Sequence, residues 1–228
     1  MIGVQAMVKA VFIDYMGTTV DEHSPEMAEI VRRICKNSSV HDPKQVQQFI
    51  LDNRRRYEAD SYLGSYLTQD EIVDQLISDM EGQIGLTDKS SALHGLIRSH
   101  WVNASVFPDA RTFFNQCLDP IYIITNIGLP YMEQALRRNG LKAAGVISAD
   151  AARAYKPHRE IFDEALRVSG CTPDEVIHIG DSYDTDVVGA RGAGIRPVLL
   201  LRGRARRHDD VDAADDLKQT LELVFKRS

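Results

Sequence analysis

Apolar residues recur along this chain in two patterns, and each pattern predicts a different kind of structure. Short apolar runs at residues 8–13, 121–125, 145–148, 176–180 and 195–201 are typical of strands buried in a parallel sheet. Helical patterns lie between the later runs, and such alternation is typical of parallel sheets with right-handed crossovers. The sequence therefore predicts an α/β fold with a doubly wound parallel-sheet core.

The second pattern fills residues 22–103, which contain no clear buried strand. Apolar side chains recur there three and four residues apart, so each predicted helix has one buried face, and we expect about four helices. The sequence Thr68-x-x-Glu71 is a typical helix start. We therefore expect residues 1–21 and 104–228 to form the α/β core domain, with residues 22–103 as a helical domain inserted after the first strand.

Polar residues follow three of the predicted strands. Asp14 ends the first apolar run, and Thr125 and Asn126 end the second. Asp181 directly follows the run at residues 176–180, and Asp186 follows close behind. The carboxyl ends of parallel strands share one edge, which is where open α/β sheets bind ligands. Any one of these residues alone could cap a turn, since Asp, Asn and Thr are ordinary turn residues. Their shared position predicts one ligand site.

A cation precedes a predicted helix in the sequence Tyr155-Lys156-Pro157. The chain thus carries strand–Asp, strand–Thr, Lys–Pro and strand–Gly–Asp motifs, and this order resembles the haloacid dehalogenase superfamily of hydrolases. The resemblance covers about residues 8–21 and 105–205, and the four motifs are specific together although each alone is weak. It implies a Rossmann-like core with an inserted all-helical cap that closes over the active site. The alternative is that the inserted helices form a rigid flank that does not move over the active site.

The resemblance also implies a metal site. Asp14 would be a nucleophile that attacks phosphorus and forms an aspartyl-phosphate. A carboxylate can attack a phosphate dianion only if a cation offsets the negative charge. The resemblance implies that this cation is Mg²⁺, a hard ion that prefers oxygen ligands. Its predicted ligands are the carboxylates of Asp14, Asp181 and Asp186 and the backbone carbonyl of Met16. Asp184 is a further candidate, with the positioning of a neighbour as its expected role.

Other residues would bind the transferring phosphoryl group. The resemblance implies a hydrogen bond from Thr125, help from Asn126, and a fixed positive charge on Lys156 that stabilises the transition state. In the predicted cap, Arg55 is our candidate for binding a carboxylate or a second phosphate of the substrate. The alternative for the Arg54–Arg56 run is a solvated helix face.

Met16 departs from the pattern of the resembled phosphatases, which carry a second Asp at this position. That Asp protonates the leaving alkoxide and then activates water, and such catalysis contributes about 10²–10⁴-fold. Met can do neither, so we expect weak activity on ordinary alkyl phosphates. A good leaving group, a proton from the cap or a different chemistry would remove the need for the Asp. His23, near the predicted cap hinge, is a candidate replacement because histidine exchanges protons near neutral pH.

The first motif also suggests an alternative enzyme. The pattern Asp-x-x-Gly-Thr-Thr-Val-Asp at residues 14–21 is similar to that of phosphonoacetaldehyde hydrolase. That branch lacks the second Asp, cleaves a carbon–phosphorus bond and uses a cap lysine to form an imine with the substrate. Its lysine lies in a Met-Gly-Leu context, which is absent around the lysines of this cap, Lys36, Lys44 and Lys89.

Two further alternatives concern the metal site. Haloacid dehalogenases also lack the second Asp, but their fourth motif has no Gly–Asp metal site. Gly180-Asp181 with Asp186 therefore favours phosphoryl chemistry on Mg²⁺ over dehalogenation. The last alternative is a catalytically impaired protein that keeps the metal site and binds a ligand with its cap. Retention of Asp14 and Lys156 argues against it.

Composition and charge are those of an ordinary soluble globular protein. The 228 residues are 43% hydrophobic and 26% charged, and the net charge of −6 gives no reason to expect nucleic-acid or membrane partners. No apolar run approaches the length of about 20 residues that spans a bilayer. A local basic run consists of Arg202, Arg204, Arg206 and Arg207. Because aspartates follow it, we expect this run to be a solvated loop that leads into the start of a helix.

The cysteines and the N-terminal sequence favour a cytoplasmic protein. Cys35, Cys117 and Cys171 are odd in number and widely spaced, which argues against a disulfide framework or a zinc site. The first residues lack the charged and apolar regions of a signal peptide, and Met7 is an alternative start. We expect a monomer or homodimer whose partner is a small phosphorylated or phosphonate metabolite.

Overall fold

A single parallel sheet forms the frame of the molecule. The computed structural model describes residues 7–203 and 206–225; residues 1–6 and 226–228 of the predicted core, and Arg204 of the basic run, lie outside it. Six strands pair in parallel in the order β3-β2-β1-β4-β5-β6. They are β1 (Ala10–Ile13), β2 (Ile121–Thr125), β3 (Gly145–Ser148), β4 (Val176–Gly180), β5 (Arg196–Leu200) and β6 (Asp212–Ala214). The predicted α/β fold is confirmed.

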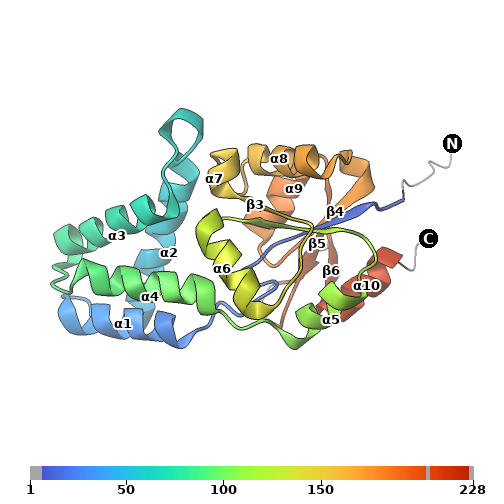
Figure 1. The fold of residues 1–228 in the computed structure, drawn as a ribbon. Coiled ribbons are helices and arrows are strands. Elements are labelled where there is room, and N and C mark those ends of the chain that lie inside the picture. Colours follow the sequence, from blue (N-terminus) through green and yellow to red (C-terminus); the bar gives the residue numbers. More distant parts are fainter. Residues whose placement is uncertain (1–6, 204–205, 226–228) are drawn as a thin grey trace.

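Helices cover both faces of this sheet (Figure 1). They are α5 (Pro108–Gln116), α6 (Leu129–Asn139), α7 (Ala149–Ala152), α8 (Arg159–Ser169), α9 (Val188–Gly192) and α10 (Leu217–Phe225), with the short helices η2 (Pro173–Glu175) and η3 (Tyr183–Val187). Alternate residues of a strand point to opposite faces. In β1, Val11 and Ile13 join an apolar cluster with α5, α6 and α10, whereas Ala10 and Phe12 join a second cluster with α8 and α9.

Four α-helices follow β1 and pack together beside the core (Figure 1). They are α1 (Pro25–Asn37), α2 (Pro43–Asp60), α3 (Gln69–Ile84) and α4 (Ser90–Asn103), and the turn η1 (Leu63–Ser65) joins α2 to α3. Thr68 starts α3 with a capping box to Glu71, as predicted. We call these helices the cap; the bounds 22–103 as a domain stay a prediction. No helix in the described part of the chain is long and apolar enough to cross a bilayer.

Two of the contacts between the cap and the core involve elements next to the candidate site. At the first, α4 packs against α6. At the second, the connection between α2 and α3 lies against the segment before α8. There Tyr66 Oη donates to Asp150 Oδ1 at 2.7 Å, and Tyr155 Oη donates to the carbonyl of Leu67 at 2.8 Å. Because Tyr155 precedes Lys156, this contact ties the cap to the segment that carries the predicted catalytic cation.

The C-terminal segment differs from the prediction. The sequence predicts a closing helix over residues 213–225, but β6 occupies the start of that range and α10 begins at Leu217. The prediction that the basic run is solvated was wrong for Arg202, whose side chain is only 9% exposed. Its Nη1 lies 2.7 Å from Asp109 Oδ2, and its Nη2 donates to the carbonyl of Thr18 at 2.5 Å. A guanidinium can be buried where oxygen acceptors take its donors in this way.

Candidate active site

Three carboxylates meet at the carboxyl edge of the two central strands. Asp14 directly follows β1, Asp181 directly follows β4, and Asp186 lies on η3 just beyond. Because β1 and β4 are parallel neighbours with Ile13 opposite Ile179, their ends bring Asp14 and Asp181 together. One oxygen from each of the three carboxylates lies within 4.8 Å of the others. We call Asp14, Asp181 and Asp186 the acidic cluster.

Lys156 places a positive charge against this cluster. Its Nζ lies 2.5 Å from Asp14 Oδ1 and 2.6 Å from Asp186 Oδ1, and its side chain is only 4% exposed. Burial lowers the pKa of Lys156, but the charges of Asp14 and Asp186 outweigh burial and raise the pKa above its ordinary value. Lys156 is therefore a fixed cation at neutral pH.

The three carboxyl groups differ in how strongly they favour ionisation. Burial raises the pKa of Asp14 despite the opposing charge of Lys156. Burial, with the charges of Asp14 and Asp186, raises the pKa of Asp181 to about 8. Burial acts in the same direction on Asp186, but Lys156 and the hydrogen-bonded His178 outweigh it and lower the pKa. Crowded, desolvated carboxylates of this kind could hold a metal ion, which would offset their charge.

His178 belongs to the site although the sequence did not indicate it. It is fully buried within β4, and its Nε2 lies 3.0 Å from Asp186 Oδ1. Its Nδ1 has no hydrogen-bond partner among the described residues. The tautomer protonated at Nε2 leaves no buried N–H unpaired, so we assign Nε2 as the donor to Asp186. A polar residue inside an apolar strand was the only signal, and it does not distinguish a core residue from a functional one.

Two glycines let the carboxylates approach the backbone closely. A Cβ on Gly17, where φ is 82°, would lie 2.4 Å from Asp181 Oδ2, and a Cβ on Gly180 would lie 2.2 Å from Asp186 Cγ. Thr18 Oγ1 then donates to Asp181 Oδ1 at 2.7 Å. The turn glycine of the first motif therefore provides both the backbone conformation and the space that Asp181 needs.

The second strand brings Thr125 and Asn126 to the same edge. Thr125 is buried at the end of β2, and its Oγ1 accepts from the backbone N–H of Ile127 at 3.2 Å. Asn126 joins the core to the cap. Its Oδ1 accepts from the backbone N–H of Lys156 at 2.9 Å, and its Nδ2 donates to Glu58 Oε2 of α2 at 3.3 Å. Glu58 was missed, because a glutamate in a polar helix sequence resembles a solvent-facing residue.

Four predicted residues lie outside this buried set. Met16 is partly buried and packs against the larger apolar cluster, whereas Arg55 and Asp184 are exposed on α2 and η3. The side chain of His23 is 65% exposed, and its Nδ1 lies 3.2 Å from Asp21 Oδ1. The roles assigned to these four residues stay predictions.

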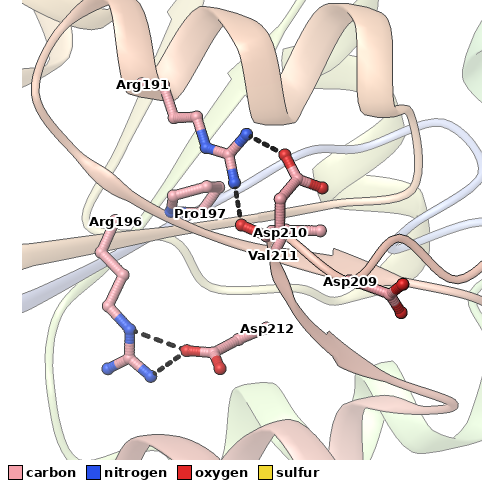
Figure 2. A pocket seen from close by; sticks show the side chains of 7 residues that line it. All are labelled: Arg191, Arg196, Pro197, Asp209, Asp210, Val211 and Asp212. Atoms are coloured by element: carbon pink, nitrogen blue, oxygen red, sulfur yellow. Dashed lines mark hydrogen bonds and ion pairs between the residues drawn. The ribbon is translucent and has the colours of Figure 1, made fainter.

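A separate pocket of about 300 Å³ lies at the opposite edge of the sheet (Figure 2). Its two arginines each contact an aspartate: Arg191 Nη1 lies 2.7 Å from Asp210, and Arg196 Nη2 lies 2.6 Å from Asp212. Arg196 and Asp212 begin β5 and β6, whereas the acidic cluster follows strand ends. The pocket is therefore distinct from the candidate active site.

Comparison with known proteins identifies relatives over most of the chain. The model of a haloacid dehalogenase-like hydrolase family matches residues 8–194. Haloacid dehalogenase-like hydrolase domain-containing protein 2 of Bos taurus is 27% identical over 241 residues, which covers 89% of this chain and 87% of the relative. A glyceraldehyde 3-phosphate phosphatase of Methanothermobacter thermautotrophicus is 33% identical over 87 residues, which covers 35% of this chain and 38% of the relative.

Solved structures share the fold. The L-2-haloacid dehalogenase of Xanthobacter autotrophicus aligns with a TM-score of 0.78 at 21% identity, over 97% of this chain and all of that one (100%). The magnesium-bound hydrolase YfnB of Bacillus subtilis aligns with a TM-score of 0.76 at 18% identity, over 96% of this chain and 99% of that one. At these identities the likeness shows the architecture and not the substrate.

Removal of the buried cation tests whether Lys156 balances the acidic cluster. In Lys156→Met, Asp14 and Asp186 lose their partner, so we expect the free energy of unfolding to fall by about 3–5 kcal/mol. Urea denaturation at pH 7 measures the change. Lys9→Met is the matched control. Lys9 forms an exposed ion pair with Glu175, and loss of this pair should change the free energy of unfolding little. A Lys156→Met protein as stable as wild type would contradict the role.

Proposed function

This chain belongs to the haloacid dehalogenase-like hydrolase family, and we propose that it is a Mg²⁺-dependent hydrolase of a small phosphorylated metabolite. The arrangement around Asp14 carries the proposal. One oxygen of Asp14 lies 2.5 Å from Lys156 Nζ, and Asp14 is also one of three carboxylates whose oxygens lie within 4.8 Å of one another. A carboxylate between a fixed cation and a candidate metal site is suited to attack a phosphate dianion.

The acidic cluster supplies oxygen ligands of the kind that Mg²⁺ prefers. Asp14, Asp181 and Asp186 would contribute carboxylate oxygens, and the backbone carbonyl of Met16 is a proposed fourth ligand. The bound ion would offset the charge of the substrate and polarise a phosphoryl oxygen. The raised pKa of Asp181 supports this assignment, because it reflects burial and an excess of negative charge that a divalent cation would relieve.

In the proposed reaction, a carboxylate oxygen of Asp14 attacks phosphorus while the bond to the leaving group breaks, which gives an aspartyl-phosphate. Lys156 stays charged throughout and stabilises the phosphoryl oxygens. Thr125 accepts a hydrogen bond from the backbone of Ile127, so its own hydroxyl proton is left to donate to a phosphoryl oxygen. Water then cleaves the aspartyl-phosphate, which regenerates Asp14 and releases phosphate.

Dehalogenation is the second candidate function. Met16 leaves the site without the second Asp of the phosphatases, and dehalogenases also lack it. Asp181 favours phosphoryl chemistry, because cleavage of a carbon–halogen bond develops no oxyanion for a metal ion to stabilise. Phosphonatase chemistry has less support: an imine-forming lysine is activated by desolvation, whereas all three cap lysines are exposed, namely Lys36, Lys44 and Lys89.

Mg²⁺ titration tests the acidic cluster. Ligation requires ionised carboxylates, and the pKa of Asp181 is raised to about 8, so binding at lower pH must release its proton. We expect the affinity to strengthen up to about tenfold per pH unit between pH 6 and 8 and then to level off. Calorimetry at pH 6, 7 and 8 measures this dependence, and Asp181→Asn should remove it. An affinity that does not change over this range would count against the assignment.

Turnover of phosphate esters tests the nucleophile. With Mg²⁺, the wild type should hydrolyse p-nitrophenyl phosphate, whose leaving group needs no proton, and Asp14→Asn should lose this activity entirely. Asp209→Asn is the control, because Asp209 is exposed in the separate pocket. Parallel assays with acetyl phosphate, sugar phosphates, phosphonoacetaldehyde and 2-chloropropionate define the substrate class.

Three results of this panel would contradict the proposal. Turnover of phosphonoacetaldehyde alone would identify a carbon–phosphorus hydrolase. Chloride release from 2-chloropropionate without phosphate release from any ester would identify a dehalogenase. Mg²⁺ binding with no turnover of any substrate would identify a ligand-binding protein.

A further inference from the structure

The cap contains a buried carboxylate that has no role in the reaction described so far. Within the part of the cap that the structure describes, four polar residues are buried as whole residues, and they are Glu58, Ser61, Gln69 and His100. Among the described residues, three of them have only partners inside the cap: Ser61 Oγ donates to the carbonyl of Leu67 at 3.2 Å, His100 Nδ1 lies 2.9 Å from Ser24 Oγ, and Gln69 donates to Glu58 itself. Glu58 differs, because it reaches out of the cap to the core.

Glu58 forms only a long ion pair among the described residues, with Arg54 of the same helix, and its hydrogen-bond donors are uncharged. Its Oε1 accepts from Gln69 Nε2 at 3.1 Å and its Oε2 accepts from Asn126 Nδ2 at 3.3 Å, and both donors are neutral amides. Arg54 Nε lies 3.8 Å away, beyond hydrogen-bond distance, on a side chain that is 50% exposed. Burial of a carboxylate costs free energy, and a half-exposed arginine at this distance offsets that cost only in part, so stability alone does not account for Glu58.

Asn126 links Glu58 to the reaction centre. Its Oδ1 accepts from the backbone N–H of Lys156, and Lys156 Nζ lies 2.5 Å from Asp14. Asn126 also follows Thr125, the proposed donor to the phosphoryl group. Glu58 thus approaches this loop from the cap, whereas Asp14 approaches from the sheet. In an in-line displacement the leaving oxygen lies opposite the nucleophile, so it faces the cap.

We propose that Glu58 is the general acid and base of this enzyme, in the role that Met16 cannot perform. The inference rests on the proposed phosphatase function. As an oxygen of Asp14 bonds to phosphorus, the bond from phosphorus to the leaving oxygen breaks. That oxygen keeps the bonding electron pair and takes the proton of the Glu58 carboxyl group. The product alcohol is then free to depart.

The second step returns the proton to Glu58. Water attacks the phosphorus of the aspartyl-phosphate and gives a proton to the Glu58 carboxylate, while Asp14 leaves as a carboxylate with its bonding pair. Phosphate is released and Glu58 is protonated for the next cycle. An acid in this place is needed only for poor leaving groups, so the substrates are phosphate monoesters of alcohols, such as polyol or sugar phosphates.

Leaving-group dependence distinguishes an acid from a structural contact. Glu58→Gln keeps the shape of the side chain and an oxygen that can accept from Asn126 Nδ2, and its amide N–H can pair with Gln69 after that amide flips, but it removes the transferable proton. We expect kcat/KM for glycerol phosphate and sugar phosphates to fall about 10²–10⁴-fold. For p-nitrophenyl phosphate, kcat/KM should change little in the same protein, because it reports the first step, which needs no acid there; kcat should fall for both substrate classes, because the base of the second step is lost. The double variant Glu58→Gln, Met16→Asp should regain alkyl phosphate turnover, because the Asp restores an acid.

Glu160→Gln is the matched control. Glu160 of α8 accepts a hydrogen bond from Tyr62 of the cap, so this variant makes the same chemical change at another contact between cap and core. It should affect alkyl and aryl phosphates by the same factor.

Two results would overturn the inference. In Glu58→Gln, equal losses of kcat/KM for both substrate classes would make Glu58 a structural contact, and undiminished kcat/KM and kcat for alkyl phosphates would leave Glu58 without a role in the reaction. Absence of Asp14-dependent turnover of p-nitrophenyl phosphate by the wild type would instead overturn the proposed function itself.

Discussion

The buried ion pairs of Lys156 with Asp14 and Asp186 are the interaction on which the rest of the site depends. Three desolvated carboxylates placed together repel one another, and a cation among them makes that arrangement possible. The parallel sheet supplies the geometry, because the ends of β1 and β4 lie side by side and the segment before α8 reaches the same edge. Tyr155, next to Lys156, binds the cap through Leu67. The position of the cation and the docking of the cap are therefore coupled.

This coupling divides the proposed chemistry between two parts of the molecule. In the proposed reaction the core would supply the nucleophile, the metal ligands and the fixed charge, which any phosphate ester requires. The cap would supply Glu58 for the departure of a poor leaving group, and the rest of its inner surface would select the substrate. Family membership is shared with relatives that include phosphatases and dehalogenases, so the substrate must be identified from the chain's own cap residues.

Sequence patterns indicated the parts of the site that follow buried strands. Asp14 and Asp181 end apolar runs that are typical of buried strands, so their position at one edge followed from parallel topology. Residues with partners in distant elements escaped notice: the burial of Arg202 depends on Asp109, and the role of Glu58 depends on Asn126. Strand β6 was missed because Asp212-Ala213-Ala214 is short and has no bulky apolar residue. The periodicity of apolar residues indicates which face of a helix or strand is buried. It does not indicate which side chain from a distant part of the sequence contacts that face.

The covalent intermediate on Asp14 is the central claim, and its direct detection is the decisive measurement. Wild-type protein with Mg²⁺ and p-nitrophenyl phosphate would be quenched in acid at a series of times and its peptides analysed by mass spectrometry. The account predicts one phosphoryl group on the peptide that contains Asp14, and none on the same peptide of Asp14→Asn. Phosphate release by the wild type with Asp14 unmodified at every quench time, or with the phosphoryl group on another residue, would contradict it.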